Sequence, residues 1–294
     1  MKAQNKKVTV PLLQKWKRKG RKIVALTAYD FATASILDNN GIDLILVGDS
    51  LGVVFQGNET TIPVTLDEVI YHSRCVSRGV KRALVVGDMP FLSYQVSPAK
   101  AIESAGRLIK EGGVSAVKVE GGIHIAEIVS RITEVDIPVM GHVGLTPQSY
   151  HRMGGNKVQG REHGSSKGQY ERIVEDALAV EAAGAFAVVV EGVPPSLGRE
   201  ITSALSVPTI GIGAGPFCDG QILVSHDAFG LFEGFKPRFV KAYANLGEII
   251  ARCAREFASE VSEGVFPAEE HCYDEPEAAM DNRRAVTLKL ARKK

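Results

Sequence analysis

Several features that would indicate a membrane, secreted or nucleic-acid-binding protein are missing from this chain of 294 residues. No apolar run is long enough to span a bilayer. The 35 Lys and Arg residues are matched by 34 Asp and Glu residues, and a net charge of +1 gives no overall field that would favour nucleic acid or an anionic membrane. The four cysteines form no C-x-x-C pair, so the sequence predicts neither a zinc finger nor a redox motif and favours free thiols in a reducing cytoplasm.

The segment Met1–Arg21 is basic, but it lacks the apolar core and the small-residue cleavage site of a secretory signal. Within it, Val10, Leu12, Leu13 and Trp16 fall at the spacing of one helix face. We therefore expect an N-terminal helix that caps one end of the fold.

Short apolar runs that stop at an ionisable residue recur along the chain, and they predict buried strands. Helical patterns separate these runs, and two of the helices begin at recognisable caps, Thr65 with Glu68 and Ser97 before Pro98. Strands that alternate with helices about eight times indicate parallel βα units. The runs that end in an ionisable side chain lie at 45–50, 83–88, 115–120, 137–142 and 185–191.

A doubly wound sheet and a closed barrel both satisfy this alternation. We favour an α/β fold of the (β/α)8 TIM barrel type with an N-terminal capping helix, because a barrel brings all of its strand ends to one polar site. Residues 219–229 are ambiguous between helix and strand. We prefer a helix there, which leaves Phe239–Lys241 as the last strand before a closing helix at 245–261. We predict a single barrel domain over residues 1–273 and a charged tail over residues 274–294.

Three acidic residues, Asp49, Asp88 and Glu120, follow successive predicted strands and offer the hard oxygen ligands that Mg²⁺ prefers. Clustered without a cation, they would repel one another and raise their own pKa values. Side chains alternate along a strand, so Lys118 points the same way as Glu120. These residues predict a metal site. The alternative is that Asp49 and Asp88 only cap helices and that Lys118 only pairs with Glu120.

A fourth acid, Glu191, ends a later strand, and a carboxylate at a partly dry barrel mouth can act as a general base. Lys118 is a candidate to hold a substrate carboxylate or to stabilise a developing enolate. The sequence leaves His142 open between a structural role and a role as an acid or as support for the site. The polar, Gly-rich stretch from residue 144 to about residue 167 is typical of a functional or mobile loop.

Three weaker patterns carry no functional prediction. Glycines in the range 211–215 match only part of a nucleotide-binding fingerprint, and we interpret them as close backbone packing at a strand end. His226–Asp227 and Glu269–His271 lack partners at metal-ligand spacing, so we interpret both as solvated or structural.

Longer motifs match one enzyme family over roughly residues 8–273. They are LTAYD at 26–30, VGDSLG at 47–52, PVT at 63–65, KVEGG at 118–122, GHVGLTPQS at 141–149, KVQGR at 157–161, GIGAG at 211–215 and DGQ at 219–221. On these motifs the chain closely resembles the ketopantoate hydroxymethyltransferase family.

The resemblance implies a barrel of the phosphoenolpyruvate/pyruvate type that assembles into a large homo-oligomer, often a decamer, in the cytoplasm. It implies transfer of a hydroxymethyl group from 5,10-methylenetetrahydrofolate to 3-methyl-2-oxobutanoate through a Mg²⁺-stabilised enolate, which gives 2-dehydropantoate for pantothenate and coenzyme A synthesis. The partners it implies are small molecules, with no nucleic acid and no membrane. The motifs alone identify no folate contacts.

The resemblance also implies roles for individual residues. One Mg²⁺ per subunit would bind at Asp49, Asp88 and Glu120; Asp49, Ser50, Asp88 and Lys118 would contact the ketoacid; and Glu191 would accept the proton. Two other functions fit the same barrel: a carbon–carbon lyase or phosphonomutase, and a non-catalytic metabolite-binding protein. An assay of folate-dependent hydroxymethyl transfer separates the three.

Overall fold

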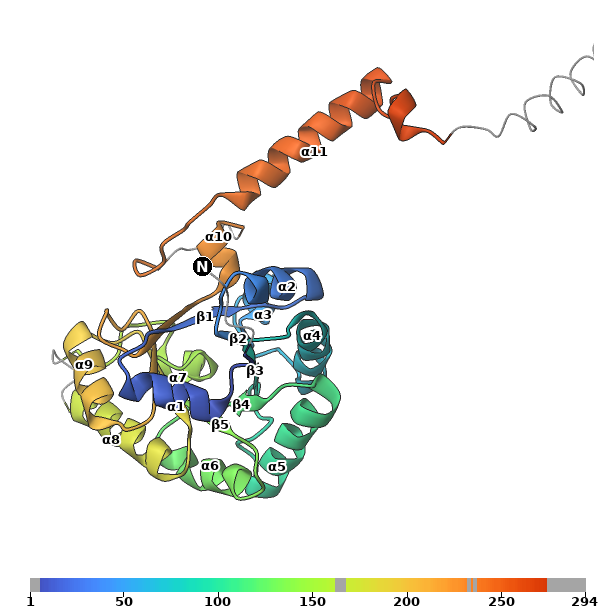
Figure 1. Ribbon diagram of the computed structural model, residues 1–294. Coiled ribbons are helices and arrows are strands. Elements are labelled where there is room, and N and C mark those ends of the chain that lie inside the picture. Colours follow the sequence, from blue (N-terminus) through green and yellow to red (C-terminus); the bar gives the residue numbers. More distant parts are fainter. Residues whose placement is uncertain (1–5, 162–167, 232–233, 235–236, 274–294) are drawn as a thin grey trace, which may run out of the picture. The chain divides into compact units, whose positions relative to one another are not determined.

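Eight short strands form the centre of the molecule, in a computed structural model that describes residues 6–161, 168–231, 234 and 237–273. Each strand pairs in parallel with the next, and β8 pairs with β1, so the sheet closes into a barrel (Figure 1). The predicted (β/α)8 fold is confirmed. The strands are β1 (Ile23–Thr27), β2 (Leu44–Val47), β3 (Leu84–Asp88), β4 (Ala116–Lys118), β5 (Val139–Gly144), β6 (Ala187–Glu191), β7 (Thr209–Ile212) and β8 (Gly220–Leu223).

Helices surround the strands (Figure 1). Both predicted caps are present: the Thr65 hydroxyl accepts from the Glu68 N–H at 3.3 Å, and the Ser97 hydroxyl accepts from the Lys100 N–H at 3.2 Å. The helices of the barrel unit are α1 (Val10–Arg18), α2 (Phe31–Asn39), α3 (Leu51–Val54), α4 (Leu66–Gly79), α5 (Pro98–Arg107), η1 (Leu108–Gly112), η2 (Ile123–Ile125), α6 (Ala126–Thr133), η3 (Pro147–Ser149), α7 (Tyr150–Met153), α8 (Gln169–Ala182), α9 (Pro195–Ala204) and α10 (Ser225–Phe229).

The two faces of each strand pack into different cores because side chains alternate along a strand. Outward-facing residues such as Val85, Val117 and Val188 belong to the apolar layer between strands and helices. Inward-facing residues fill the barrel interior. The interior cluster contains Ile23, Ala25, Leu44, Leu46, Leu84, Val86, Ala116, Met140, Ala187, Val189, Ile210 and Ile222, with Val8, Leu13 and Trp16 from the N-terminal segment.

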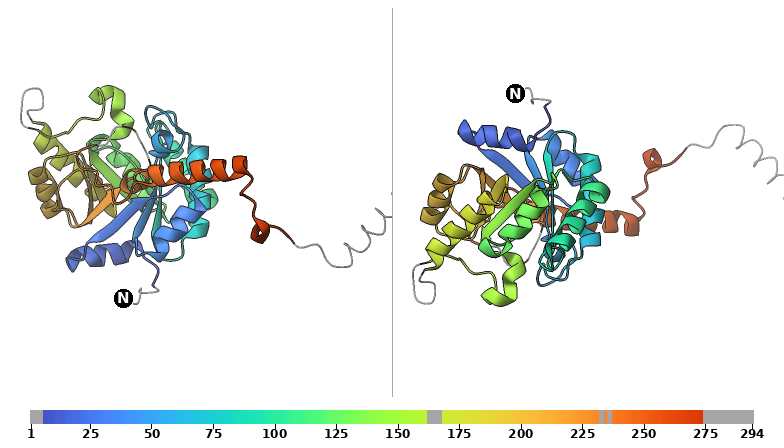
Figure 2. Two further views of the ribbon diagram at one scale, coloured as in Figure 1. Left: turned by 90° about the horizontal axis from the view of Figure 1, so that it is seen from above. Right: turned by 90° about the horizontal axis from the view of Figure 1, so that it is seen from below.

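The N-terminal helix covers one end of the barrel, as predicted. Leu13 and Trp16 are buried in the interior cluster, and the Arg21 guanidinium lies 3.4 Å from the centre of the Trp16 ring. Figure 2 shows α1 (blue) at one end of the strands and the segment that follows β5 (yellow-green) at the other. Apolar side chains of α1 therefore seal the amino end, and the carboxyl ends of the strands stay available for a site.

The predicted last strand is wrong. Residues 220–223 form β8, which pairs with both β7 and β1, and only 225–229 of the ambiguous segment are helical. The sequence signal is weak because Gly220 and Gln221 are poor strand formers. Phe239 lies in a turn instead, and its ring lies so close to Gly213 that a Cβ added to the glycine would come within 2.7 Å of it.

The chain divides into two compact units between Ala244 and Asn245. The second unit contains α11 (Leu246–Glu263) and η5 (Glu269–His271), and apolar side chains of α11 such as Phe257 are exposed. The domain boundary expected after residue 273 falls within this unit, and the expected tail, 274–294, lies outside the described residues. Among the described helices, none has the length and apolar character needed to cross a membrane.

Candidate active site

The predicted site residues all line one cavity of about 110 Å³ at the carboxyl ends of the strands. Asp88, Lys118 and Glu191 are the last residues of β3, β4 and β6, and each has the inward parity of the apolar interior residues below it. The others follow their strands by two or three residues or lie within β5. The predicted residues around this cavity are Asp49, Ser50, Asp88, Lys118, Glu120, His142 and Glu191.

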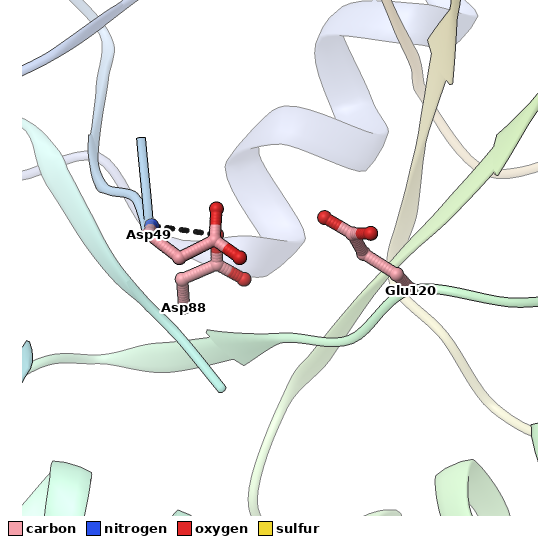
Figure 3. A group of neighbouring side chains, drawn as sticks. All are labelled: Asp49, Asp88 and Glu120. Carbon is pink, nitrogen blue, oxygen red and sulfur yellow. Dashed lines mark hydrogen bonds between the residues drawn. The ribbon is translucent and has the colours of Figure 1, made fainter. Parts of the chain in front are cut away.

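Three carboxylates form the centre of the site. Oxygen atoms of Asp49, Asp88 and Glu120 lie within 4.8 Å of one another, and Figure 3 shows the Glu120 carboxylate directed toward the other two. The Asp49 N–H donates to Asp88 Oδ2 at 3.1 Å, which fixes the turn after β2 against β3. Burial raises the pKa of Asp49 well above its usual range, and repulsion from Asp88 and Glu120 raises it further. The protein groups alone therefore leave this cluster short of positive charge.

Lys118 supplies part of that charge. Its Nζ lies 2.7 Å from Asp88 Oδ1 and 3.2 Å from Glu120 Oε1, and its side chain is buried. Burial alone would lower the pKa of Lys118, but the carboxylates of Asp88, Glu120 and Asp49 outweigh it and raise the pKa well above its usual value. A single ammonium thus faces three carboxylates, and burial still raises the pKa of Asp88 despite its contact with Lys118.

His142 lies between the cluster and the proposed base. Its Nδ1 is 3.4 Å from Glu120 Oε1 and its Nε2 is 3.2 Å from Glu191 Oε2, although the angles at both nitrogens fall short of hydrogen bonding. Burial alone would lower the pKa of His142, but Glu120 and Glu191 raise it to about 9. At neutral pH the imidazolium therefore lies between two carboxylates.

The cationic side chains of the site lower the pKa of Glu120. Burial alone would raise its pKa, but Lys118 and His142 lower the pKa of Glu120 to about 2. Glu120 is therefore ionised at neutral pH. Glu191 differs from it in exposure: 15% of its side chain is accessible, against 2% for Glu120. The Glu191 carboxylate is thus accessible from the barrel mouth.

Gln148, for which no role was predicted, holds the cluster together from the loop after β5. Its Nε2 donates to Asp49 Oδ2 at 2.9 Å, and its N–H donates to Glu120 Oε2 at 3.0 Å. Its Oε1 accepts from the Tyr94 hydroxyl at 2.9 Å. Another predicted site residue, Ser50, is also held by a tyrosine: its Oγ lies 2.8 Å from the Tyr29 hydroxyl. The position of Gln148 in a polar, Gly-rich loop was the available signal.

The weaker patterns take no part in the acid cluster. Gly215 has a φ of 78° and lies against Pro195, so that an added Cβ would come within 2.7 Å, in agreement with close backbone packing. The His226 ring lies 5.4 Å from the Tyr29 ring, centre to centre. His271 accepts from the Ala268 N–H at 3.2 Å in the second unit.

Comparison with known sequences identifies the family that these features fit. The sequence model of ketopantoate hydroxymethyltransferase matches residues 7–269. The chain is 57% identical over 268 residues to the 3-methyl-2-oxobutanoate hydroxymethyltransferase of Trichlorobacter lovleyi, which covers 91% of this chain and 99% of that one. It is 55% identical over 274 residues to the protein of that name from Pelobacter propionicus, which covers 93% and 100%.

Solved structures share the fold at low sequence identity. Phosphonopyruvate hydrolase in complex with oxalate and Mg²⁺ matches with a TM-score of 0.58 at 14% identity, over 94% of this chain and 97% of that one. 2,3-Dimethylmalate lyase, a member of the PEP mutase/isocitrate lyase superfamily, matches with a TM-score of 0.55 at 13% identity, over 94% and 98%. The barrel is thus of the type found in that superfamily.

Proposed function

Because the chain belongs to the ketopantoate hydroxymethyltransferase family, we propose that the acid cluster and Glu191 carry out its reaction. The reaction adds a hydroxymethyl group to 3-methyl-2-oxobutanoate and gives dehydropantoate for pantothenate synthesis. We take the donor to be 5,10-methylenetetrahydrofolate. The observation that carries the proposal is the convergence of three buried carboxylates, Lys118 and Glu191 on one small cavity.

The acid cluster fits a divalent cation. Asp49, Asp88 and Glu120 offer hard oxygen atoms within 4.8 Å of one another. Burial raises the pKa of Asp49, and repulsion from the other two carboxylates raises it further. These three residues would hold one Mg²⁺ per subunit. When bound, the ion would act as a Lewis acid toward the ketone oxygen of the substrate. Oxygen ligands also suit Mn²⁺, and we choose Mg²⁺ because the family resemblance implies it.

The ketoacid would occupy the cavity beside the cluster. The Lys118 ammonium provides a cation for the substrate carboxylate, and the Ser50 hydroxyl, held by Tyr29 at 2.8 Å, provides a neutral polar contact. Apolar side chains on the other walls, Val189 and Ile222 among them, suit the branched end of the substrate. These contacts would orient the branched carbon toward Glu191.

Glu191 would then remove the proton from the branched carbon next to the ketone. Its partial exposure and its position at the mouth suit proton transfer, and His142 at 3.2 Å restrains the carboxylate. Loss of that proton makes the branched carbon nucleophilic, and it attacks the one-carbon unit of the donor. The proton thus moves to a Glu191 oxygen, and the new carbon–carbon bond forms at the branched carbon. The bonds from the transferred carbon to the two folate nitrogens break, and water supplies the hydroxyl oxygen. The abstracted proton and one proton of the water end on the folate nitrogens, and tetrahydrofolate leaves.

A decameric assembly and a cytoplasmic location complete the proposal. The assembly is supported by the family alone. The location is supported by the described cysteines, which are free thiols.

Deuterium exchange at the branched carbon tests the role of Glu191. Glu191→Gln keeps the shape of the side chain but removes the basic oxygen, so we expect Mg²⁺ and ketoacid binding to persist while exchange is abolished. The matched control is Glu127→Gln, because Glu127 is exposed on α6 and lies outside the cavity. Normal exchange in Glu191→Gln, followed by NMR in deuterated buffer, would sink the assignment.

A further inference from the structure

A second and larger cavity lies beside the proposed active site. Its volume is about 400 Å³, whereas the cavity at the acid cluster measures about 110 Å³. One stretch of chain lines both: His142 and Pro147 belong to the smaller cavity, and Val143, Gly144 and Thr146 belong to the larger one. The two cavities are therefore separated by little more than the backbone of β5 and the loop that follows it.

The larger cavity has an excess of basic side chains. Arg152, Lys157 and Arg172 line it, together with His124 and a single carboxylate, that of Asp176. We call it the basic cavity. Its lining comes from the turn after β4, from residues 143–159 and from α8, and the stretch 143–159 also carries Gln148 into the acid cluster. Three permanent cations against one carboxylate make it a site for an anionic ligand.

The one carboxylate of the basic cavity is already engaged in the fold. Asp176 Oδ1 accepts from the Ile123 N–H at 2.8 Å, and its side chain lies over Gly122, where a Cβ would come within 1.9 Å of it. Gly122 therefore leaves the space that Asp176 needs to reach the backbone. This arrangement ties Asp176 to the turn after β4 and leaves most of the positive charge of the cavity to a ligand.

The wall between the cavities is connected to the proposed base. The Gln159 N–H donates to the Gly192 carbonyl at 2.8 Å, and the Leu145 N–H donates to the Glu191 carbonyl at 2.8 Å. The Gln159 side chain in turn accepts from Gln169 Nε2 at 2.6 Å, at the start of α8. A ligand in the basic cavity would therefore lie next to the segment that positions Glu191.

The proposed reaction supplies a ligand with matching chemistry. The one-carbon donor must bring its reactive carbon to the ketoacid, but the 110 Å³ cavity has room only for the smaller substrate. The remainder of the donor must extend beyond it, and a tetrahydrofolate ends in a glutamate with two carboxylates. We infer that the basic cavity binds the glutamate end of the folate cosubstrate through Arg152, Lys157 and Arg172. This inference rests on the proposed function.

The test compares two one-carbon donors that differ only at the glutamate end. The double variant Arg152→Gln/Arg172→Gln should raise the KM for 5,10-methylenetetrahydrofolate about tenfold or more, because each lost contact is to a charged group. With 5,10-methylenetetrahydropteroate, which lacks the glutamate, variant and unmodified protein should have the same KM. The KM for 3-methyl-2-oxobutanoate and the deuterium exchange rate should stay unchanged, which also shows that the variant is folded.

The matched control is Arg131→Gln on α6, which pairs with Glu134 away from the cavity and should change neither KM. An unchanged KM for the full donor in the double variant, or an equal loss with both donors, overturns the inference. Binding of inorganic phosphate is measured as well. If the double variant loses phosphate binding but keeps its KM for 5,10-methylenetetrahydrofolate, the basic cavity binds an anion other than the folate, and this also overturns the inference. If the unmodified protein transfers from neither donor, the proposed function itself fails, and this inference fails with it.

Discussion

The two ends of the barrel interior contain side chains of opposite character, although the same strands supply both. At the amino end, Leu44 and Leu84 meet Leu13 and Trp16 of α1 in one apolar cluster. At the carboxyl end, residues that end the strands or closely follow them place four carboxylates, an ammonium and an imidazolium around one small cavity. The difference lies in the residues that end the strands and in those that directly follow them.

The two ends of the barrel therefore contribute differently, the amino end to the stability of the fold and the carboxyl end to the chemistry. Burial of apolar side chains at the amino end stabilises the fold, whereas burial of charges at the carboxyl end is costly unless they are paired. The pKa values show that cost, since burial raises the pKa of Asp49 and of Asp88. Substitutions at the amino end should therefore change the free energy of unfolding, and substitutions at the carboxyl end should change binding and rate.

The largest stability effect is expected at the α1 seal. Trp16→Ala removes a buried ring from the interior cluster and should lower the free energy of unfolding by about 3–5 kcal/mol. Turnover per folded molecule should stay unchanged, because the ring lies at the end away from the acids. Chemical denaturation and initial rates measure the two quantities. Tyr71→Ala, at an exposed ring, is the control and should shift stability by about 0.5 kcal/mol or less. Lost turnover at retained folding would contradict the separation.

A smaller effect is expected where Gln148 supports the acids. Gln148→Leu removes the hydrogen bonds from Nε2 to Asp49 and from Tyr94 to Oε1, but it keeps the backbone bond to Glu120. Groups that orient metal ligands in this way contribute about 10–100-fold to metal affinity or activity. We expect a loss of that size in Mg²⁺ affinity, measured by calorimetry. An unchanged affinity would mean that Gln148 shapes the loop only.

The smallest effect is expected at Tyr29. Tyr29→Phe removes one hydrogen bond to Ser50, which contributes about 0.5–1.5 kcal/mol. The KM for 3-methyl-2-oxobutanoate should rise by about twofold to tenfold, since Ser50 would lose its orientation while the Lys118 contact persists. Steady-state kinetics at fixed folate concentration provide the measurement. A KM that does not change would remove Ser50 from the substrate contacts.

The sequence predicted the carboxyl end well because its signal is local. Because the carboxyl ends of parallel strands converge, residues that end a strand or follow it by two positions come together, and the structure places Asp49, Asp88, Lys118 and Glu120 around one cavity. The substrate came from the family resemblance, since acids at strand ends describe a metal site and no particular ketoacid.

Long-range contacts were beyond the sequence pattern. Gln148 reaches Asp49 across 99 positions, and no periodicity in a polar loop encodes such a contact. The last strand was missed for a related reason. Gly220 of β8 pairs with Ile23 of β1, the first strand in the sequence. The pairing that closes the barrel therefore stabilises β8 more than the strand propensity of its own residues does.

The central claim is that the acid cluster is a divalent-cation site and that Lys118 alone does not neutralise it. Calorimetric titration of Mg²⁺ in the presence of 3-methyl-2-oxobutanoate tests this most directly, with Asp49→Asn alongside the unmodified protein. The account predicts one Mg²⁺ per chain in the unmodified protein and a large loss of affinity in Asp49→Asn. No saturable binding, or equal affinity in both proteins, would contradict it and leave Lys118 and the His142 imidazolium as the cations of the cluster.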